Sequence, residues 1–277
     1  MEEALIRVLR LAGFILFLPL VLLPFYWMVI SALRPLQDLL LRPANLWPDW
    51  DRIGFQAFYD VLFEHGFLRY ILNSAYVSLA TVVLSTALAV LGGYAVTRLR
   101  FRGQPLLSHG ILLIYMFPAI VLAVPLYVIF SRLGLRDSVH ALILVYLAQT
   151  LPVALYMLRS YFMTLPPELE HAGLVDGCTR LGVIWRIVLP LSAPALAGVA
   201  LYTFMIAWNE FLFAFMFLDT PEKFTLSLGV VQLAESVHLS KQLVMAASVL
   251  VTFPVLVVFF LFERFLVRGL AAGAVKG

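Results

Sequence analysis

Residues 11–33 read LAGFILFLPLVLLPFYWMVISAL, a stretch without a single charged side chain. A helix needs roughly 20 mostly apolar residues to cross a bilayer, because hydrocarbon offers backbone amides no partners outside their own segment. Similar stretches follow at residues 71–97, 110–131, 139–158, 191–218 and 243–262. We therefore predict an all-α polytopic membrane protein, with one transmembrane domain over residues 1–277 and six spanning helices.

The composition supports lipid as the main solvent of this fold. Of the 277 residues, 63% are hydrophobic and 13% are charged, and the mean hydropathy is +0.99. Soluble domains are only about 45–50% apolar. The net charge of +3 reflects a bias of basic residues toward the inner loops and is no evidence for nucleic acid, so we expect none as a partner. With Cys178 as the single cysteine, an intrachain disulfide is excluded.

The first stretch could also be a signal peptide, since Arg7 and Arg10 precede it. Its apolar run is longer than the 7–15 residues typical of such a segment, which favours a spanning helix. Arg98, Arg100 and Arg102 form a tight cluster after the second stretch. Because positive loops stay in the cytoplasm, this cluster predicts that both termini are cytoplasmic.

The loop at residues 159–190 carries a short predicted helix outside the membrane. Pro166 and Pro167 favour a helix start, and the pair Asp176-Gly177 favours an end. Between them an apolar stripe follows helical spacing, at Leu165, Leu169, Ala172 and Val175. A helix of two turns is marginal in water and needs a packing partner. Small residues at Ala172 and Gly173 would admit a partner's backbone, although the helix could instead pack under its own bundle.

From His171 the chain reads HAGLVDG, then nine residues, then IVLP from Ile187. This resembles the signature of binding-protein-dependent ABC importer permeases, Glu-Ala-Ala, three residues, Gly, nine residues, Ile-x-Leu-Pro. His171 replaces the family's Glu and Gly173 its second Ala. The resemblance implies that a coupling helix docks on a cytoplasmic ATPase. The implied coupling residues are Leu169, Glu170, His171, Ala172, Gly173, Asp176, Gly177, Ile187, Leu189 and Pro190.

Two further segments resemble the MalG-like branch, the permeases for maltose, trehalose and related carbohydrates. They are residues 207–213, AWNEFLF, and the C-terminal tail. The resemblance implies a sugar substrate, with glycerol phosphate as an alternative. It also implies a second permease, expected to be a different chain, two ATPase subunits that use ATP and Mg²⁺, an extracytoplasmic solute-binding protein, and the inner membrane of a prokaryote. We expect this chain itself to bind no cofactor or metal.

The tail from Gly269 to Gly277 has three glycines and no helical stripe, so we expect it to be flexible when free. By the same resemblance it would reach into the ATPase dimer. The residues implied are Gly273, Ala274, Val275, Lys276 and Gly277. The alternative is a solvated end without a role.

The chain lacks the phosphate-binding motif of an ATPase, because none of its lysines, Lys223, Lys241 and Lys276, follows a glycine. Energy would then come from a separate ATPase subunit or from an ion gradient. A gradient-driven carrier usually has several ionisable groups in its spans, and here Glu210 is the only one. An intramembrane enzyme is disfavoured, since all five histidines fall in or beside loops.

A sugar path needs polar and aromatic groups at membrane depth, to bond hydroxyls and to stack on ring faces. The candidates are Tyr115, Gln149, Thr150, Tyr202, Trp208, Asn209 and Glu210. For each of them, bonding between helices of the same chain is the competing interpretation.

Overall fold

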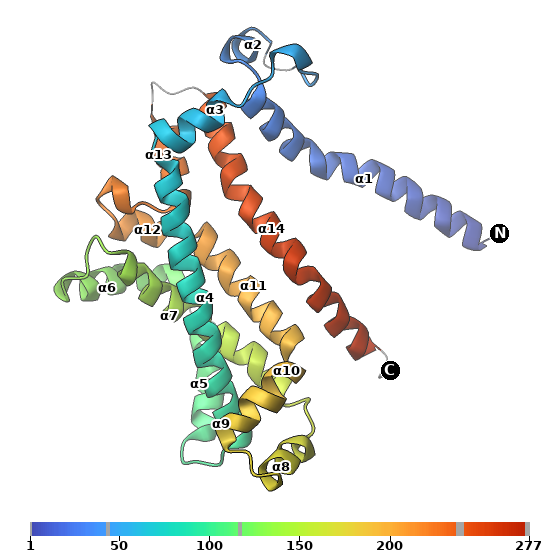
Figure 1. Cartoon of the computed structure of the whole chain (residues 1–277), viewed down its shortest axis with the longest axis vertical. Helices are drawn as coiled ribbons and strands as arrows, with labels where there is room; N and C mark the ends of the chain where they lie inside the picture. Colours follow the sequence, from blue (N-terminus) through green and yellow to red (C-terminus); the bar gives the residue numbers. More distant parts are fainter. Residues whose placement is uncertain (1, 43–44, 116–117, 237–240, 275–277) are drawn as a thin grey trace. The chain divides into compact units, whose positions relative to one another are not determined.

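The computed structural model describes residues 2–42, 45–115, 118–236 and 241–274, and these contain helices and no strand (Figure 1). This confirms the all-α prediction. Contacts divide the chain into two compact units, Met1–Leu68 with Gly229–Phe253, and Arg69–Leu228 with Pro254–Gly277. The main helices are α1 (Glu2–Leu33), α2 (Leu36–Leu41), α3 (Gln56–Tyr59), α4 (Phe67–Arg98), α5 (Gln104–Tyr115), α6 (Ala119–Arg132), α7 (Val139–Phe162), α8 (Pro167–Val175), α9 (Arg180–Val183), α10 (Leu189–Leu191), α11 (Ala193–Asn209), α12 (Leu212–Phe217), α13 (Leu226–Glu235) and α14 (Lys241–Ala274).

Within the described ranges, four helices are long and apolar enough to cross a membrane: α1, α4, α7 and α14. They contain the predicted stretches at residues 11–33, 71–97, 139–158 and 243–262. A fifth span results if the segment Arg180–Leu191 and α11 count as one, and these two meet at an angle of 83°. The six-span architecture itself stays a prediction.

The third predicted stretch, residues 110–131, is divided between α5 and α6. Pro118 precedes α6 in extended conformation, and a proline has no amide hydrogen to continue a helix. The fifth, residues 191–218, also differs from one continuous helix. It is interrupted at Glu210, whose backbone is extended, before α12 begins. Both interruptions occur at a residue with extended backbone, Pro118 in the third stretch and Glu210 in the fifth.

The unit that contains α1 includes a loop tied together by Arg34. The Arg34 guanidinium donates hydrogen bonds to the carbonyl oxygens of Asp38, Arg42 and Asn45 at 3.1, 3.0 and 2.9 Å. Its own carbonyl accepts a bond of 2.7 Å from the Gln242 amide. These bonds hold the end of α2 and the residues up to Asn45 against the end of α1.

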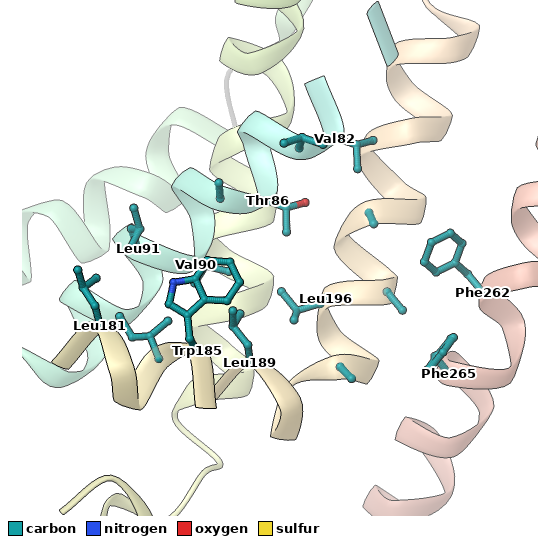
Figure 2. A pocket seen from close by; sticks show the side chains of 16 residues that line it. Val82, Thr86, Val90, Leu91, Leu181, Trp185, Leu189, Leu196, Phe262 and Phe265 are labelled. Carbon is teal, nitrogen blue, oxygen red and sulfur yellow. The ribbon is translucent and has the colours of Figure 1, made fainter. Parts of the chain in front are cut away.

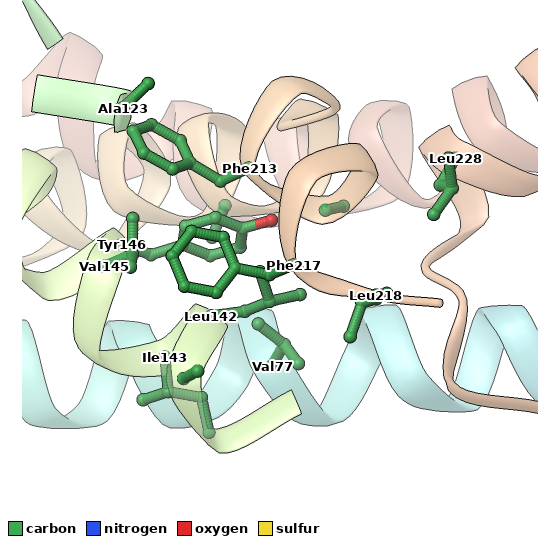
Figure 3. Close-up of a cluster of buried hydrophobic side chains, with 13 residues drawn as sticks. Val77, Ala123, Leu142, Ile143, Val145, Tyr146, Phe213, Phe217, Leu218 and Leu228 are labelled. Carbon is green, nitrogen blue, oxygen red and sulfur yellow. The ribbon is translucent and has the colours of Figure 1, made fainter. Parts of the chain in front are cut away.

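The other unit has two apolar cores along α4 and α7. One core gathers residues of α7 and α12, including Tyr146, Phe213 and Phe217, which are almost fully buried (Figure 3). The second joins Val90 of α4 and Leu158 of α7 to the segment after α8. Helices α8 and α9 therefore lie at the end of α4 that carries Arg98 (Figure 1).

The C-terminal segment departs from its prediction. The sequence predicts a tail that is flexible when free from Gly269 onward, whereas α14 continues through Gly273 to Ala274. Alanine is the strongest helix former, and extending an existing helix avoids the cost of a new nucleus. Residues 275–277, with Val275, Lys276 and Gly277, lie outside the described part of the chain.

Candidate functional site

Helix α8 begins and ends where the sequence predicts. Pro166 lies just before it in extended conformation and Pro167 is its first residue. At the other end Gly177 has a φ of +87°, which favours glycine. The Cys178 amide donates to the Gly173 carbonyl at 3.0 Å, and the Gly177 amide to the Leu174 carbonyl at 3.1 Å. This pair of bonds is the Schellman arrangement that closes a helix.

Arg98, the last residue of α4, anchors α8 to the rest of its unit. Its Nε lies 2.7 Å from Oε1 of Glu170, and the two side chains are only 14% and 8% exposed. Its Nη2 donates to the carbonyls of Phe162 and Leu165 at 2.9 and 2.8 Å. One guanidinium thus joins the ends of α4 and α7, the loop before α8, and α8 itself. An ion pair this well hydrogen-bonded can be buried without leaving donors or acceptors unpaired.

The two faces of α8 have opposite character. Glu170 and Gly173 are buried against the chain's own unit. Leu169 is 44% exposed, Val175 is 87% exposed, and Ala172 between them is exposed as well. The apolar stripe of α8 therefore faces away from the protein, and the polar, anchored face is turned inward. We call Leu169, Ala172 and Val175 the open stripe.

Gly173 has a role that the sequence did not suggest. A Cβ atom at this position would lie 2.5 Å from Cδ1 of Ile187 and 3.4 Å from Cγ2 of Val183. The expectation that Gly173 admits a partner's backbone is therefore replaced, since it admits the chain's own Ile187. Of the two small residues, Ala172 is the one that faces outward.

The segment after α8 packs inward. Thr179 caps α9 by accepting a hydrogen bond from the Gly182 amide at 3.1 Å. Val183, Ile184 and Val188 are buried in the core shared with α4 and α7, and Leu189 packs against it. Pro190 is exposed within the short α10. The buried residues of this segment thus hold α8 in place.

The opposite end of α4 is tied to the segment after α12. The Asn73 amide donates to the carbonyls of Glu222 and Phe224, both at 2.9 Å. Ser74 Oγ accepts from the Leu226 amide at 2.7 Å. These side chains fix where the chain enters α13.

Asp137, in the turn between α6 and α7, binds the same segment. Its carboxylate accepts from the Thr220 hydroxyl and amide, the Asp219 amide and Nζ of Lys223, the last at 2.7 Å. Partial burial alone would raise the pKa of the Asp137 carboxyl. The hydrogen bonds from Lys223 and Thr220 outweigh burial and hold that pKa well below its ordinary value of 3.8. Arg136 adds an exposed pair with Asp219 at 2.9 Å.

Two of the predicted path residues share a cavity. Gln149 of α7 and Tyr202 of α11 line a space of about 350 Å³, together with Leu122 and Leu126 of α6 and Phe213 of α12. The Gln149 Nε2 atom is buried and has no hydrogen-bond partner among the described residues. An amide donor left unpaired on a cavity wall is available to a hydroxyl ligand.

Other predicted path residues are engaged within the chain. The Thr150 hydroxyl is buried and bonds the Tyr146 carbonyl and Ser85 Oγ at 2.8 and 3.2 Å. Trp208 is 3% exposed and stacks on Phe204 with ring centroids 5.3 Å apart. Asn209 is exposed and donates to its own helix. For Thr150 and Trp208, the structure favours a packing role. Tyr115 ends α5, and its side chain lies outside the described set.

Glu210 holds the break between α11 and α12. Its carboxylate accepts from the amides of Phe213 and Ala214 at 3.0 and 3.2 Å and from the Tyr146 hydroxyl at 2.9 Å. Carboxylates are favoured at the exposed amides of a helix start. The sequence missed Tyr146 as this partner, because a tyrosine in an apolar stretch gives no sign of what it faces.

A larger groove of about 730 Å³ lies between α4, the segment Arg180–Leu191, α11 and the second half of α14. Figure 2 shows the Trp185 indole pointing into it beside Val90 and Leu196. Apart from Thr86 and this indole, its lining side chains are apolar. Such a surface suits lipid rather than a sugar, so the smaller cavity at Gln149 is the better candidate path. Among described residues, no group of three or more His, Cys, Asp or Glu could hold a metal ion.

Comparison with known proteins agrees with this geometry. The family model described as "Binding-protein-dependent transport system inner membrane component" matches residues 85–272. The chain is 38% identical over 278 residues to the inner membrane ABC transporter permease protein YcjP of Escherichia coli, covering 100% of this chain and 99% of that protein. It is 35% identical, with the same coverage, to the trehalose/maltose transport system permease protein MalG of Thermococcus litoralis.

A solved structure has the same fold. It belongs to a bacterial ABC transporter involved in the import of the acidic polysaccharide alginate, with a TM-score of 0.83 over 95% of this chain and 97% of that one, at 21% identity. The family match covers α8, the segment after it, and the cavity at Gln149. The chain therefore belongs to the inner membrane components of binding-protein-dependent transport systems, the permease subunits of ABC transporters.

Proposed function

We propose that this chain is one permease subunit of an ATP-driven importer and forms part of the path for a carbohydrate. Relatives named for trehalose/maltose, diacetylchitobiose and arabinooligosaccharides support the substrate class. The partners are a second permease, two ATPase subunits that use ATP and Mg²⁺, and an extracytoplasmic solute-binding protein. Hydrolysis occurs on the ATPase subunits, and this chain binds no nucleotide. Both termini are cytoplasmic, which puts α8 in the cytoplasm.

The open stripe of α8 carries the proposal. Leu169 and Val175 are exposed while Glu170 is buried and paired with Arg98. A short helix that turns its apolar side toward water gains by docking, at roughly 25 cal/mol per Å² of apolar surface covered. If a docked partner moves, the anchored inner face of α8 would transmit this displacement to α4 and α7, because the anchor prevents α8 from rotating about its own axis. Docking on an ATPase subunit satisfies both features.

The cavity at Gln149 is the proposed contact with the sugar. The Gln149 amide offers donors and an acceptor to hydroxyl groups, and the Tyr202 ring offers a face for a sugar ring. The apolar neighbours exclude water without binding any one sugar tightly. A site with few polar groups suits transient passage.

The experiment is uptake by the complete complex in proteoliposomes, with ATP inside and the binding protein outside. We expect uptake of labelled maltose or trehalose and stimulation of ATP hydrolysis by the loaded binding protein. Ala172→Trp on the open stripe should abolish that stimulation, whereas the matched control Ala172→Ser should preserve it. Transport by this chain without ATP, or normal uptake by Ala172→Trp, would overturn the proposal. Uptake of glycerol phosphate but of no sugar would overturn only the substrate class.

A further inference from the structure

A basic hollow lies between α8 and the Arg98 end of α4, next to the ion pair that anchors α8. A cavity of about 370 Å³ lies between the Arg98 end of α4 and α8, and a second hollow of about 850 Å³ adjoins it. Both are lined by Arg98, Arg100, Arg180 and His171. Glu170, in the smaller cavity, is the only acidic side chain among the lining residues.

The charges in this hollow are not balanced. Glu170 is already paired with Arg98 at 2.7 Å, so it compensates neither of the other arginines in full. Arg180 and Glu170 both interact with the Tyr94 hydroxyl. Arg100 and His171 are exposed and have no hydrogen bond or ion pair with any described residue. Two guanidinium groups and an imidazole therefore face the hollow without a carboxylate of their own.

The hollow is continuous with the docking face. Successive residues of a helix are about 100° apart, so His171 lies between Glu170, which faces the core, and Ala172, which faces outward. A protein seated on the open stripe would cover His171 and the mouth of the hollow. Covering Arg100 and Arg180 without a counter-charge would remove the hydration of each ion without compensation. A partner that docks here must therefore bring an anion.

We propose that the hollow receives an aspartate or glutamate side chain of the ATPase subunit that docks on α8. This inference rests on the proposed function and adds the chemistry of the partner surface. His171 lies at the rim of the hollow and adds no negative charge there. The matching surface of its ATPase is acidic, and an ATPase that presents an arginine to this rim would be disfavoured.

The test measures association of the cognate ATPase with the complete permease complex in uncharged detergent, as a function of salt. Arg100→Glu and Arg180→Glu should each weaken association at least tenfold at low salt and flatten its salt dependence. Arg186→Glu is the matched control, because Arg186 is exposed on the same segment and lines neither hollow. Reversing single acidic residues on the ATPase should yield one variant that restores binding to Arg100→Glu.

Arg100→Glu keeps the inference testable if Arg180→Glu perturbs Tyr94, since Arg100 has no partner among the described residues. Equal affinity and equal salt dependence for the wild type and Arg100→Glu would overturn the inference. So would an effect that appears only in nanodiscs with phosphatidylglycerol, because the anion would then be a lipid headgroup. If Ala172→Trp also fails to weaken association, the proposed docking on α8 is wrong. If Ala172→Trp blocks association of the ATPase but neither Arg100→Glu nor Arg180→Glu weakens it, docking on α8 stands and only the proposed contact with an acidic side chain is wrong.

Discussion

Removing Arg98 should release α8 from its unit. Arg98→Ala leaves the Glu170 carboxylate buried without its cation and removes donors from the carbonyls of Phe162 and Leu165. Breaking a buried pair by deleting one partner costs about 3–5 kcal/mol. Since the Arg98 side chain keeps 14% exposure, we take the lower end, about 3 kcal/mol, which is roughly a hundredfold in the equilibrium between docked and released α8.

Hydrogen exchange measures this equilibrium directly. The amides of Gly177 and Cys178 close α8 through bonds to its own carbonyls, so their exchange reports opening of the helix. In Arg98→Ala we expect them to exchange up to about a hundred times faster, while the core amides of α7 keep their protection. Arg98→Lys should lie between, because an ammonium keeps the charge but loses the fork that reaches three acceptors. Arg186→Ala is the control, and it should leave the exchange unchanged.

Function gives a second measurement on the same variant. With the cognate ATPase present, Arg98→Ala should hydrolyse ATP at its basal rate but lose stimulation by the loaded binding protein. Wild-type protection at Gly177 together with wild-type stimulation would refute the reasoning. The ion pair would then contribute little to holding α8, and packing on Ile187 and Val183 would be enough to keep the helix in place.

Three further predictions concern other parts of the chain. Gly173→Val should lower the melting temperature through a collision with Ile187, costing about 1–3 kcal/mol, whereas in Gly173→Ala the gain in helix propensity of about 1 kcal/mol offsets a small shift. The Asp137 carboxyl has a folded-state pKa below its ordinary 3.8, so its contribution is present above that pH and is lost as pH falls below it. Asp137→Asn should make the melting temperature less dependent on pH below 3.8. At neutral pH the variant should also melt lower, because it loses the attraction between the Asp137 carboxylate and Lys223. Glu210→Gln should lower stability by about 1.5–3 kcal/mol, with uptake falling in parallel in a transport assay.

Local signals in the sequence predicted local structure well. The apolar stretches mark the long helices because the requirement for internal hydrogen bonds in lipid leaves few alternatives. Pro167 and Gly177 set the ends of α8 because each acts through its own backbone dihedrals. The breaks at Pro118 and Glu210 were missed as breaks, because composition alone does not separate a kinked span from a divided one.

The pairing of side chains was not predictable in the same way. Arg98 and Glu170 are 72 residues apart, so only the fold brings them together. Gln149 and Thr150 looked equivalent as polar neighbours, yet they differ by about 100° around α7. One therefore lines the cavity, while the other bonds Ser85 of α4. Polarity within a span marked both residues as candidates for a functional or structural contact. The direction of each side chain on α7 determines whether it lines the cavity or bonds a neighbouring helix.

The architecture of α4 connects these observations. Of the four long apolar helices, α4 is the one with no proline inside, whereas α1, α7 and α14 each contain at least one. Its first turns are bonded to the segment after α12 through Asn73, and its last residue is bonded to α8 through Arg98. A helix without an internal proline lacks one common cause of a kink, while a proline provides a place to bend. We therefore expect a push on α8 to reach the far end of α4 along its axis, and any flexure that changes the cavity at Gln149 to occur in α7 at Pro152.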